Sequence, residues 1–383
     1  MTHRSFRALR RALRVFAFGA ALASAAACSR SDSGAIRIGL AGPFTDPVGE
    51  PMKLAAELAV DEINSRGGVG GRAIELIVRD DFANPDSAVY VATDLKGAGV
   101  AAVIGHLWSG TTLAAAPVYN TGADAVAAIS PSSSAPAVSA AGPWTFRLCP
   151  SDREHGAALA RWIRNKLAYD RGAVLYLNDE YGRGVRQTFV AEYTRLGGEL
   201  VAIDPYLGST PDVGMYLDRL AKTGGIQFIV LAGNRDEGEL ILREARRRSL
   251  TVPVLGADGL EGIEAAGPVA EGVYISQAYL PTLDNPSNRR FVQAWTRKYP
   301  NGGLPTQPAA ATYDAVYLLR DVIARAGAER QAVRDELARV GLATAPFRGV
   351  TGAIAFDSLG DVPAAAVHVA VVRGGTVVQA DGR

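Results

Sequence analysis

The feature that most constrains this 383-residue chain is a regular alternation of short apolar stretches with longer amphipathic ones. The short stretches have the length of buried strands, and the longer ones carry apolar residues at helical spacing. Strands that are separated by helices predict parallel sheets with helices packed on their faces. The first part of the chain predicts strands at 36–40, 74–78, 100–104 and 125–129, and helices at 53–64, 87–96 and 113–119.

The alternation starts again after a segment rich in Ser, Ala and Pro. It predicts helices at 157–167 and 185–196 and strands at 173–177, 200–203, 226–231, 252–255 and 273–276. A chain of this length exceeds the size at which a single core stops growing, so two lobes are expected. The last third predicts helices at 286–299, 309–326 and 329–340, then strands at 353–356 and 365–372. If these helices belong to one lobe and these strands to the other, the chain crosses several times and forms a hinge.

The N-terminus indicates export from the cytoplasm. Five Arg precede an apolar run at 15–23 that is too short to span a bilayer, and small residues follow up to Cys28. We therefore expect a signal peptide over residues 1–27, with both the general secretory and the twin-arginine routes open. Ala25-Ala26-Ala27-Cys28 fits either lipidation of Cys28, with residues 28–34 as a tether, or a simple cut after the Ala residues. Lipidation would anchor the protein to the membrane from outside the cytoplasm.

Charge and residue types narrow the function classes. Removal of residues 1–27 takes away five Arg and no acidic residue, which leaves 35 basic and 39 acidic side chains, so a nucleic-acid partner is not expected. With Cys28 lipidated, Cys149 would be the one remaining thiol, and we expect it to be a small buried side chain. The His residues show no metal-ligand spacing. Gly182-Arg183-Gly184 lacks the third glycine of a dinucleotide loop. The chain is therefore not expected to be an enzyme or to hold a metal or cofactor.

The loop Gly105–Thr112 is the strongest candidate for a binding site on its own chemistry. It joins a predicted strand to a predicted helix, which is where α/β sheets bind ligands. It offers the hydroxyls of Ser109, Thr111 and Thr112, together with the free N–H groups of a first helical turn. An anion such as a carboxylate would suit this place.

Several stretches together resemble one family. They are Asp61-Glu62-Ile63-Asn64, 67–72, 105–112, 129–134, Tyr181-Gly182-Arg183-Gly184, 256–259, 270–274 and 349–357. In this order and spacing the chain resembles the leucine/isoleucine/valine-binding type of periplasmic binding protein, the solute-binding subunit of ABC importers. The resemblance implies a type I periplasmic binding fold: two Rossmann-like α/β lobes joined by a multi-crossover hinge, with lobe 1 at 35–149 plus 281–348 and lobe 2 at 150–280 plus 349–383. It also implies a monomer that delivers a small amino acid to an ABC permease in the inner membrane.

The resemblance also assigns roles to single residues. Ser109 and Ser134 match positions that bind the ligand carboxylate, and Leu107 and Ser133 beside them are included in the expected site. The ammonium group would be met by the carbonyl of Ser132 and by the side chain of Asp258. Tyr181 matches an aromatic residue of the second lobe that closes over the ligand. Two other interpretations stay open: Ser132–Ser134 as a flexible loop, and Asp258-Gly259 as a simple turn.

The departures from the family pattern concern the side-chain pocket. Asn234 and Val48 stand where the branched-chain binders have Tyr, and Ala83 and Trp108 replace two Cys that pair in the family. Two interpretations of Trp108 stay open: it intrudes on the pocket, so that the ligand differs from leucine, or it is a surface or core aromatic residue. Two alternatives to amino-acid import remain on the same fold: a binder of amides or aromatic acids, and a ligand sensor that signals to a receptor partner.

Overall fold

The computed structural model describes residues 34–208 and 213–380. The chain divides into two units, Met1–Ala35 and Ile36–Arg383, and every element below belongs to the second. The predicted signal peptide, the lipidation site Cys28 and the tether up to Ser33 lie outside the described residues. None of the helices within the described ranges has the length and apolar character needed to cross a membrane.

The first sheet is parallel throughout, with strand order β2-β1-β3-β4-β5. The strands are β1 (Ile36–Gly42), β2 (Ile74–Asp80), β3 (Ala102–Ile104), β4 (Ala128–Ser130) and β5 (Thr145–Arg147). Helices α2 (Glu50–Ser65), α3 (Pro85–Gly97) and α4 (Ser109–Asn120) connect the first four strands in turn. The predicted alternation is therefore confirmed here. One detail was wrong: α4 begins at Ser109, inside the segment expected to be loop up to Thr112.

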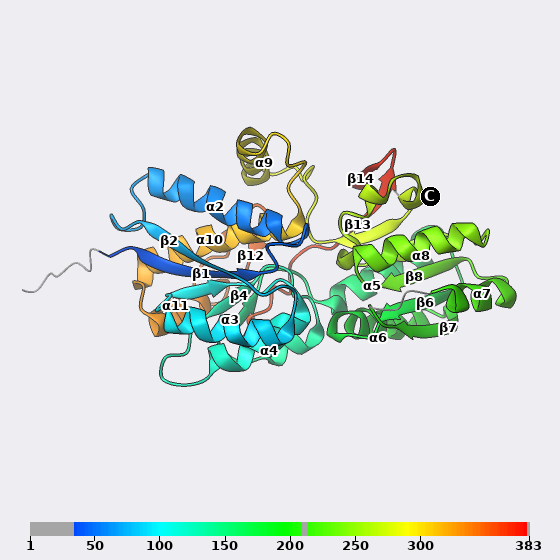
Figure 1. The fold of residues 1–383 in the computed structure, drawn as a ribbon, viewed down its shortest axis with the longest axis horizontal. Helices are drawn as coiled ribbons and strands as arrows, with labels where there is room; N and C mark the ends of the chain where they lie inside the picture. Colours follow the sequence, from blue (N-terminus) through cyan, green and yellow to red (C-terminus); the bar gives the residue numbers. More distant parts are fainter. Residues whose placement is uncertain (1–33, 209–212, 381–383) are drawn as a thin grey trace, which may run out of the picture. The chain divides into compact units, whose positions relative to one another are not determined.

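Helices cover both faces of this sheet (Figure 1). On one face, Ile38 and Leu40 of β1 pack in an apolar cluster with α2 and with α10 (Gln307–Ala326). On the other face, Val103 packs in a second cluster with α3 and α4. Two further helices, α9 (Pro286–Lys298) and α11 (Arg330–Leu337), pack beside α2 and α10. Strands buried on both faces explain the continuous apolar stretches in the sequence.

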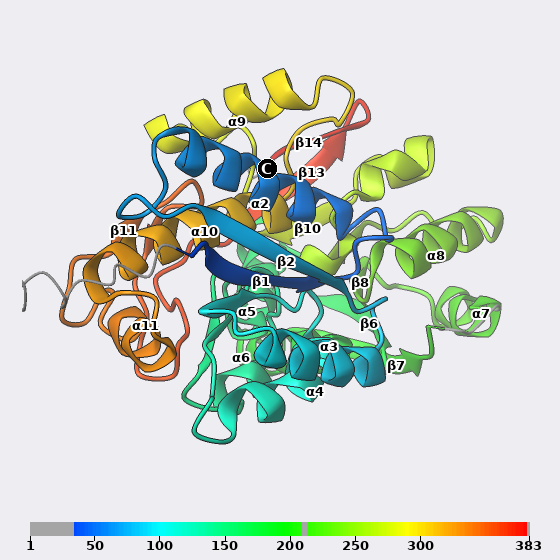
Figure 2. The same ribbon diagram turned by 60° about the vertical axis from the view of Figure 1, so that its left-hand side comes forward.

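The second sheet has the order β14-β13-β10-β9-β8-β6-β7. Its strands are β6 (Arg171–Leu177), β7 (Glu199–Tyr206), β8 (Phe228–Ala232), β9 (Val254–Gly256), β10 (Tyr274–Gln277), β13 (His368–Arg373) and β14 (Thr376–Gln379). The first five of these are mutually parallel, whereas β13 and β14 extend the sheet in antiparallel pairing. Helices α5 (Asp152–Trp162) and α6 (Glu180–Arg195) pack on one face, and α7 (Gly214–Thr223) and α8 (Arg235–Arg247) on the other (Figure 2).

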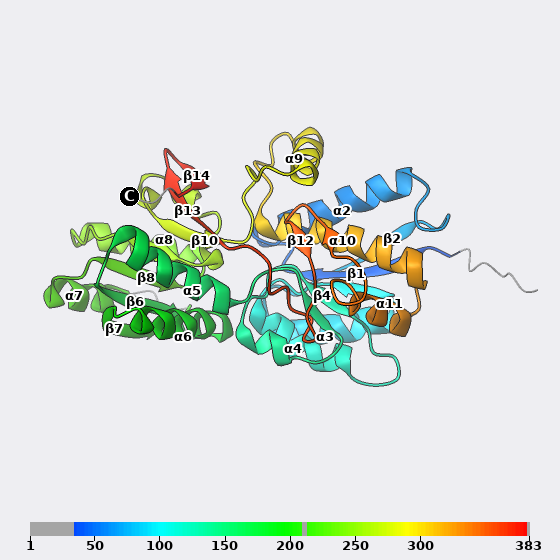
Figure 3. The same ribbon diagram turned by 180° about the vertical axis from the view of Figure 1, so that it is seen from behind.

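The chain passes between the two sheets three times, which agrees with the prediction that it crosses several times between the lobes. The crossings are 148–151 between β5 and α5, 278–285 between β10 and α9, and 355–367 between β12 (Ala353–Ile354) and β13 (Figure 3). The fully buried Arg147 connects the first and third of them, because its Nε atom forms an ion pair with Asp361 Oδ1 at 2.8 Å.

The last crossing differs from the expected lobe boundary. Strand β12 pairs with β11 (Phe347–Arg348), and Ile354, Phe356 and Val362 belong to the apolar cluster of the first sheet. The expectation placed residues from 349 onward in lobe 2. We propose instead that lobe 1 comprises 36–149 plus 281–362, and lobe 2 150–280 plus 363–380.

Candidate functional site

A cavity of about 230 Å³ lies between the two lobes. From lobe 1 it is lined by Asp46, Val48, Ala83, Leu107, Trp108, Ser109, Ser132 and Pro308, and from lobe 2 by Tyr181, Asn234, Arg235, Asp236, Glu237, Asp258, Gly259 and Glu261. Seven of the nine predicted ligand-binding residues are in this lining. The other two, Ser133 and Ser134, are not.

The first turn of α4 forms an anion-binding corner of the cavity. Trp108 precedes the helix in extended conformation and its side chain does not cap the helix, so the N–H groups of the first turn have no partner within the helix. The hydroxyl oxygen of Ser109 accepts a hydrogen bond from the Ala135 N–H at 3.2 Å, which leaves its own proton free to donate into the cavity. Neutral donors at a helix N-terminus suit a carboxylate.

Ser133 and Ser134 have other surroundings than the family resemblance implies. Ser133 Oγ lies 2.6 Å from Thr112 Oγ1 and donates to the Leu107 carbonyl at 3.1 Å, so it braces the loop before α4. Ser134 is buried, and its hydroxyl has no hydrogen-bond partner among the described residues. Its carbonyl accepts from Asp152 N–H, which ties it to the start of α5.

Tyr181 and Asp258 form the opposite wall. The Tyr181 hydroxyl donates to Asp258 Oδ1 at 2.8 Å and accepts from the Gly259 N–H at 2.7 Å. The ring lies so close to Gly259 that a Cβ there would come within 2.7 Å of Tyr181 Cε1, so glycine is required by contact. Burial and the neighbouring Asp258 raise the pKa of Tyr181, which therefore stays a neutral donor that orients the carboxylate.

A layer of buried polar groups stands behind Asp258. His155 Nε2 lies 3.7 Å from Asp258 Oδ2, and His155 Nδ1 lies 3.0 Å from Ser276 Oγ. Asp152 is fully buried, and neither carboxylate oxygen has a hydrogen-bond partner among the described residues. Burial, followed by repulsion from Asp258, raises the pKa of Asp152. The raised pKa favours the uncharged form of Asp152, so it is the Asp258 carboxylate that favours a cationic group at this end of the cavity.

Several lining residues were not predicted, because α8 was not expected. Its first residues, Arg235, Asp236 and Glu237, line the cavity, and Arg235 pairs with Asp236 at 3.0 Å. Glu261 was also missed. Its Oε1 atom accepts from the N–H of Gln307 at the start of α10 at 2.6 Å, which is a direct contact between the lobes. Burial raises the pKa of Glu261 to about 8.

The remaining polar residues of interest have structural surroundings. His106 is buried, with Nδ1 2.6 Å from Asp81 Oδ2 and Nε2 3.2 Å from the Tyr119 hydroxyl, and it holds the loop before α4. Cys149 is buried and free, as expected. In the parts of the chain that the structure describes, no group of three or more His, Cys, Asp or Glu could hold a metal ion.

Comparison with known proteins places this geometry in a family. Residues 35–376 match the family model described as "Periplasmic binding protein". The leucine-, isoleucine-, valine-, threonine- and alanine-binding protein of Pseudomonas aeruginosa is 30% identical over 337 residues, which are 85% of this chain and 87% of the relative.

Solved structures agree with this result. The substrate-binding protein LivJ from Streptococcus pneumoniae, in complex with isoleucine, is 27% identical, with a TM-score of 0.82 over 90% of this chain and 97% of that one. An ABC transporter substrate-binding protein from Desulfitobacterium hafniense, in complex with Leu, is 30% identical, with a TM-score of 0.78 over 90% and 99% of the two chains. The chain belongs to the periplasmic binding protein family, with the two-lobed type I fold of the substrate-binding proteins of ABC transporters.

Proposed function

We propose that this protein captures a small amino acid between its lobes outside the cytoplasm and delivers it to an ABC permease. The observation that carries the proposal is the pair of opposite walls in one cavity. Ser109 and the first turn of α4 offer donors to a carboxylate, and Asp258 across the cavity offers a carboxylate to an ammonium group. The names and bound ligands of the similar proteins support an amino acid as the solute.

Closure of the hinge would follow from these contacts. A ligand that bonds to Ser109 on lobe 1 and Asp258 on lobe 2 stabilises the arrangement in which both walls face the cavity. The hydrogen bond from the Gln307 N–H of lobe 1 to the Glu261 carboxylate of lobe 2 is a further contact between the two lobes.

A thermal-shift screen over the common amino acids, followed by calorimetry on the best one, tests the proposal. Ser109→Ala and Asp258→Asn should each weaken binding about tenfold or more, because each removes a charge-assisted hydrogen bond. Asp170→Asn serves as a control, since this exposed carboxylate lies outside the cavity lining. Unchanged affinity in both site variants would show that the site is assigned wrongly.

A second candidate is a binder of aromatic acids or amides. Trp108 and Asn234 favour it, because they line the cavity where leucine binders have other residues. Asp258 opposes it, since a carboxylate at this wall repels a ligand that has no amino group. If an aromatic acid binds better than any amino acid, and Asp258→Asn strengthens its binding, the second candidate replaces the first.

Membrane attachment is part of the proposal. We infer that Cys28 is lipidated and becomes the first residue of a monomeric protein tethered outside the cytoplasm; the sequence before and at Cys28 supports this. Mass spectrometry of the protein from its native membrane should find a diacylglyceryl group on Cys28. A mature N-terminus without lipid would contradict the anchor but leave the solute-binding function intact.

A further inference from the structure

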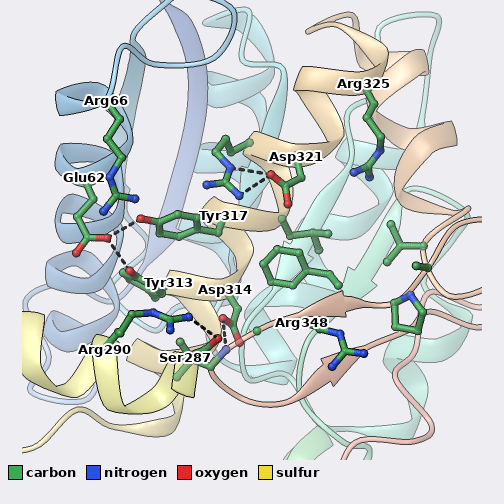
Figure 4. Close-up of a pocket in the computed structure, with 18 residues that line it drawn as sticks. Glu62, Arg66, Ser287, Arg290, Tyr313, Asp314, Tyr317, Asp321, Arg325 and Arg348 are labelled. Atoms are coloured by element: carbon green, nitrogen blue, oxygen red, sulfur yellow. Dashed lines mark hydrogen bonds and ion pairs between the residues drawn. The ribbon is translucent and has the colours of Figure 1, made fainter. Parts of the chain in front are cut away.

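A second cavity, of about 550 Å³, lies within lobe 1 and is separate from the ligand cleft. Its walls come from α2, α9, α10 and the β11 segment, and Figure 4 shows their side chains surrounding the opening. Five guanidinium groups line it: Arg66, Arg290, Arg320, Arg325 and Arg348. Because no wall belongs to lobe 2, this cavity does not depend on closure of the hinge.

Two of its three acidic groups are bonded to neutral donors. Glu62 Oε2 accepts from the hydroxyls of Tyr313 at 2.7 Å and Tyr317 at 2.5 Å. Asp314 accepts from the backbone N–H of Val350 at 2.7 Å and from the backbone and hydroxyl of Thr351 at 2.9 and 2.7 Å. These carboxylates hold tyrosines and a loop in place, and neither forms an ion pair with an arginine among the described residues.

The arginines fall into two sets. Arg320 pairs with Asp321 at 2.6 Å, and Arg325 pairs with Glu336 at 2.5 Å. Arg66, Arg290 and Arg348 form no ion pair with any carboxylate in the described part of the chain, although Arg290 donates to Ser287 Oγ at 3.3 Å. The lining thus carries three unpaired cations, and Figure 4 shows that they enter from different sides: Arg66 and Arg290 from one side and Arg348 from the other.

This arrangement differs from a scatter of surface arginines. The guanidinium group binds carboxylates and phosphates through two parallel hydrogen bonds, and several such groups around one hollow can act on one ligand. The wall between them is aromatic, with the Tyr313 and Tyr317 ring centroids 4.8 Å apart and Arg320 stacked over Tyr317 at 4.7 Å. Because the three unpaired arginines are exposed, their attraction for an anion is screened by salt and is strongest at low ionic strength.

We propose that this lobe 1 cavity binds a small oxyanion with two or more negative charges, of the phosphate or polycarboxylate type, independently of the solute in the cleft. Arg66, Arg290 and Arg348 supply the charge that the ligand neutralises. The site goes beyond the proposed import function and does not rest on it.

Calorimetry at low ionic strength tests this proposal with pyrophosphate and citrate as separate probes and acetate as the singly charged comparison. We expect at least one of the two multivalent anions to bind the wild type more tightly than acetate does, and which of them does so identifies the chemical type. The triple variant R66Q/R290Q/R348Q should bind that anion at least tenfold more weakly. Arg297→Gln is the matched control, because Arg297 is exposed on α9 and lies outside the lining. This variant should bind the anion with an affinity within twofold of that of the wild type.

The outcomes separate this proposal from the import function. Because the three arginines are exposed, the triple variant should keep the wild-type melting temperature and bind the best cleft ligand within twofold of the wild type. If neither multivalent anion binds the wild type, or if the triple variant binds it as the wild type does, the proposal is overturned. Failure to find any cleft ligand would leave these anion titrations unaffected.

Discussion

The Tyr181 hydroxyl is bonded on both sides, to Asp258 Oδ1 and to the Gly259 N–H. It therefore positions the carboxylate that we assign to the ligand ammonium. Tyr181→Phe keeps the ring but leaves the Gly259 N–H and one oxygen of Asp258 without this hydrogen-bond partner. The loss should lower the free energy of unfolding by about 1–2 kcal/mol. Because the loss of these bonds also weakens the folded protein, we expect the melting temperature to fall by a few degrees and ligand affinity to fall about tenfold. Calorimetry on the variant checks this, and wild-type affinity would show that the hydroxyl has no positioning role.

The free energy of unfolding should depend on pH through the titration of Glu261. Burial raises its pKa from 4.5 to about 8, so its contribution to stability is present below pH 4.5 and is lost as pH rises through about 8. Glu261→Gln can still accept from the Gln307 N–H but does not titrate. Urea unfolding at pH 5 and 8.5 should show that the wild type loses on the order of 1–3 kcal/mol relative to the variant, a value reduced for partial solvent exposure. Parallel pH profiles would contradict this assignment.

Single residues also show how far the sequence predicts the site. Leu107, Trp108, Ser109, Ser132, Tyr181, Asn234 and Asp258 reach the cavity, because each lies at the carboxyl end of a strand or at the start of the following helix. Ser133 and Ser134 are adjacent in sequence but are buried outside the lining, because the irregular backbone of this loop gives its side chains no regular direction. No local pattern distinguishes these hydroxyls from that of Ser132.

At the scale of elements, most helices were predicted, including the charged α9 and α11, whereas α7 and α8 were missed. α2 and α10 carry continuous apolar faces, and the predicted ranges 53–64 and 309–326 lie within the observed helices. α8 was missed although it is amphipathic: its few apolar residues, such as Ile241 and Leu242, are buried at helical spacing in a sequence dominated by Arg and Glu. The missed helix begins with three cavity residues, so an error in secondary structure became an error in the site.

Arg147 connects elements that are far apart in sequence. Its guanidinium donates to the carbonyls of Ser134 and Ala135 and to Ser139 Oγ, and it pairs with Asp361 of the third crossing. Arg147→Met should lower the free energy of unfolding by about 3–5 kcal/mol, because it leaves a carboxylate and several carbonyls without their partner. Urea unfolding measures this. A loss below 1 kcal/mol would show that water replaces the guanidinium at little cost.

At the scale of the whole molecule, two lobes and repeated crossings follow from length and alternation, but the lobe boundary does not. Ile354 and Phe356 belong to a short apolar stretch that looks like any other predicted strand in the sequence. Only tertiary packing shows that they join the core of the first sheet while β13 and β14 complete the second. The antiparallel pairing of β13 and β14 at the edge of the second sheet could not be predicted for the same reason. The direction of β13 depends on the path by which the chain enters lobe 2, and the sequence does not show this path.

The central claim is that one ligand is held by its two charged groups between opposite lobes. A crystal structure of the protein with its best-binding amino acid tests this claim most directly. We predict that the ligand carboxylate lies within hydrogen-bond distance of Ser109 Oγ and the first-turn N–H groups of α4, and that its ammonium group lies against Asp258. A ligand bound outside this cavity, or bound with its carboxylate against Asp258, would contradict the account.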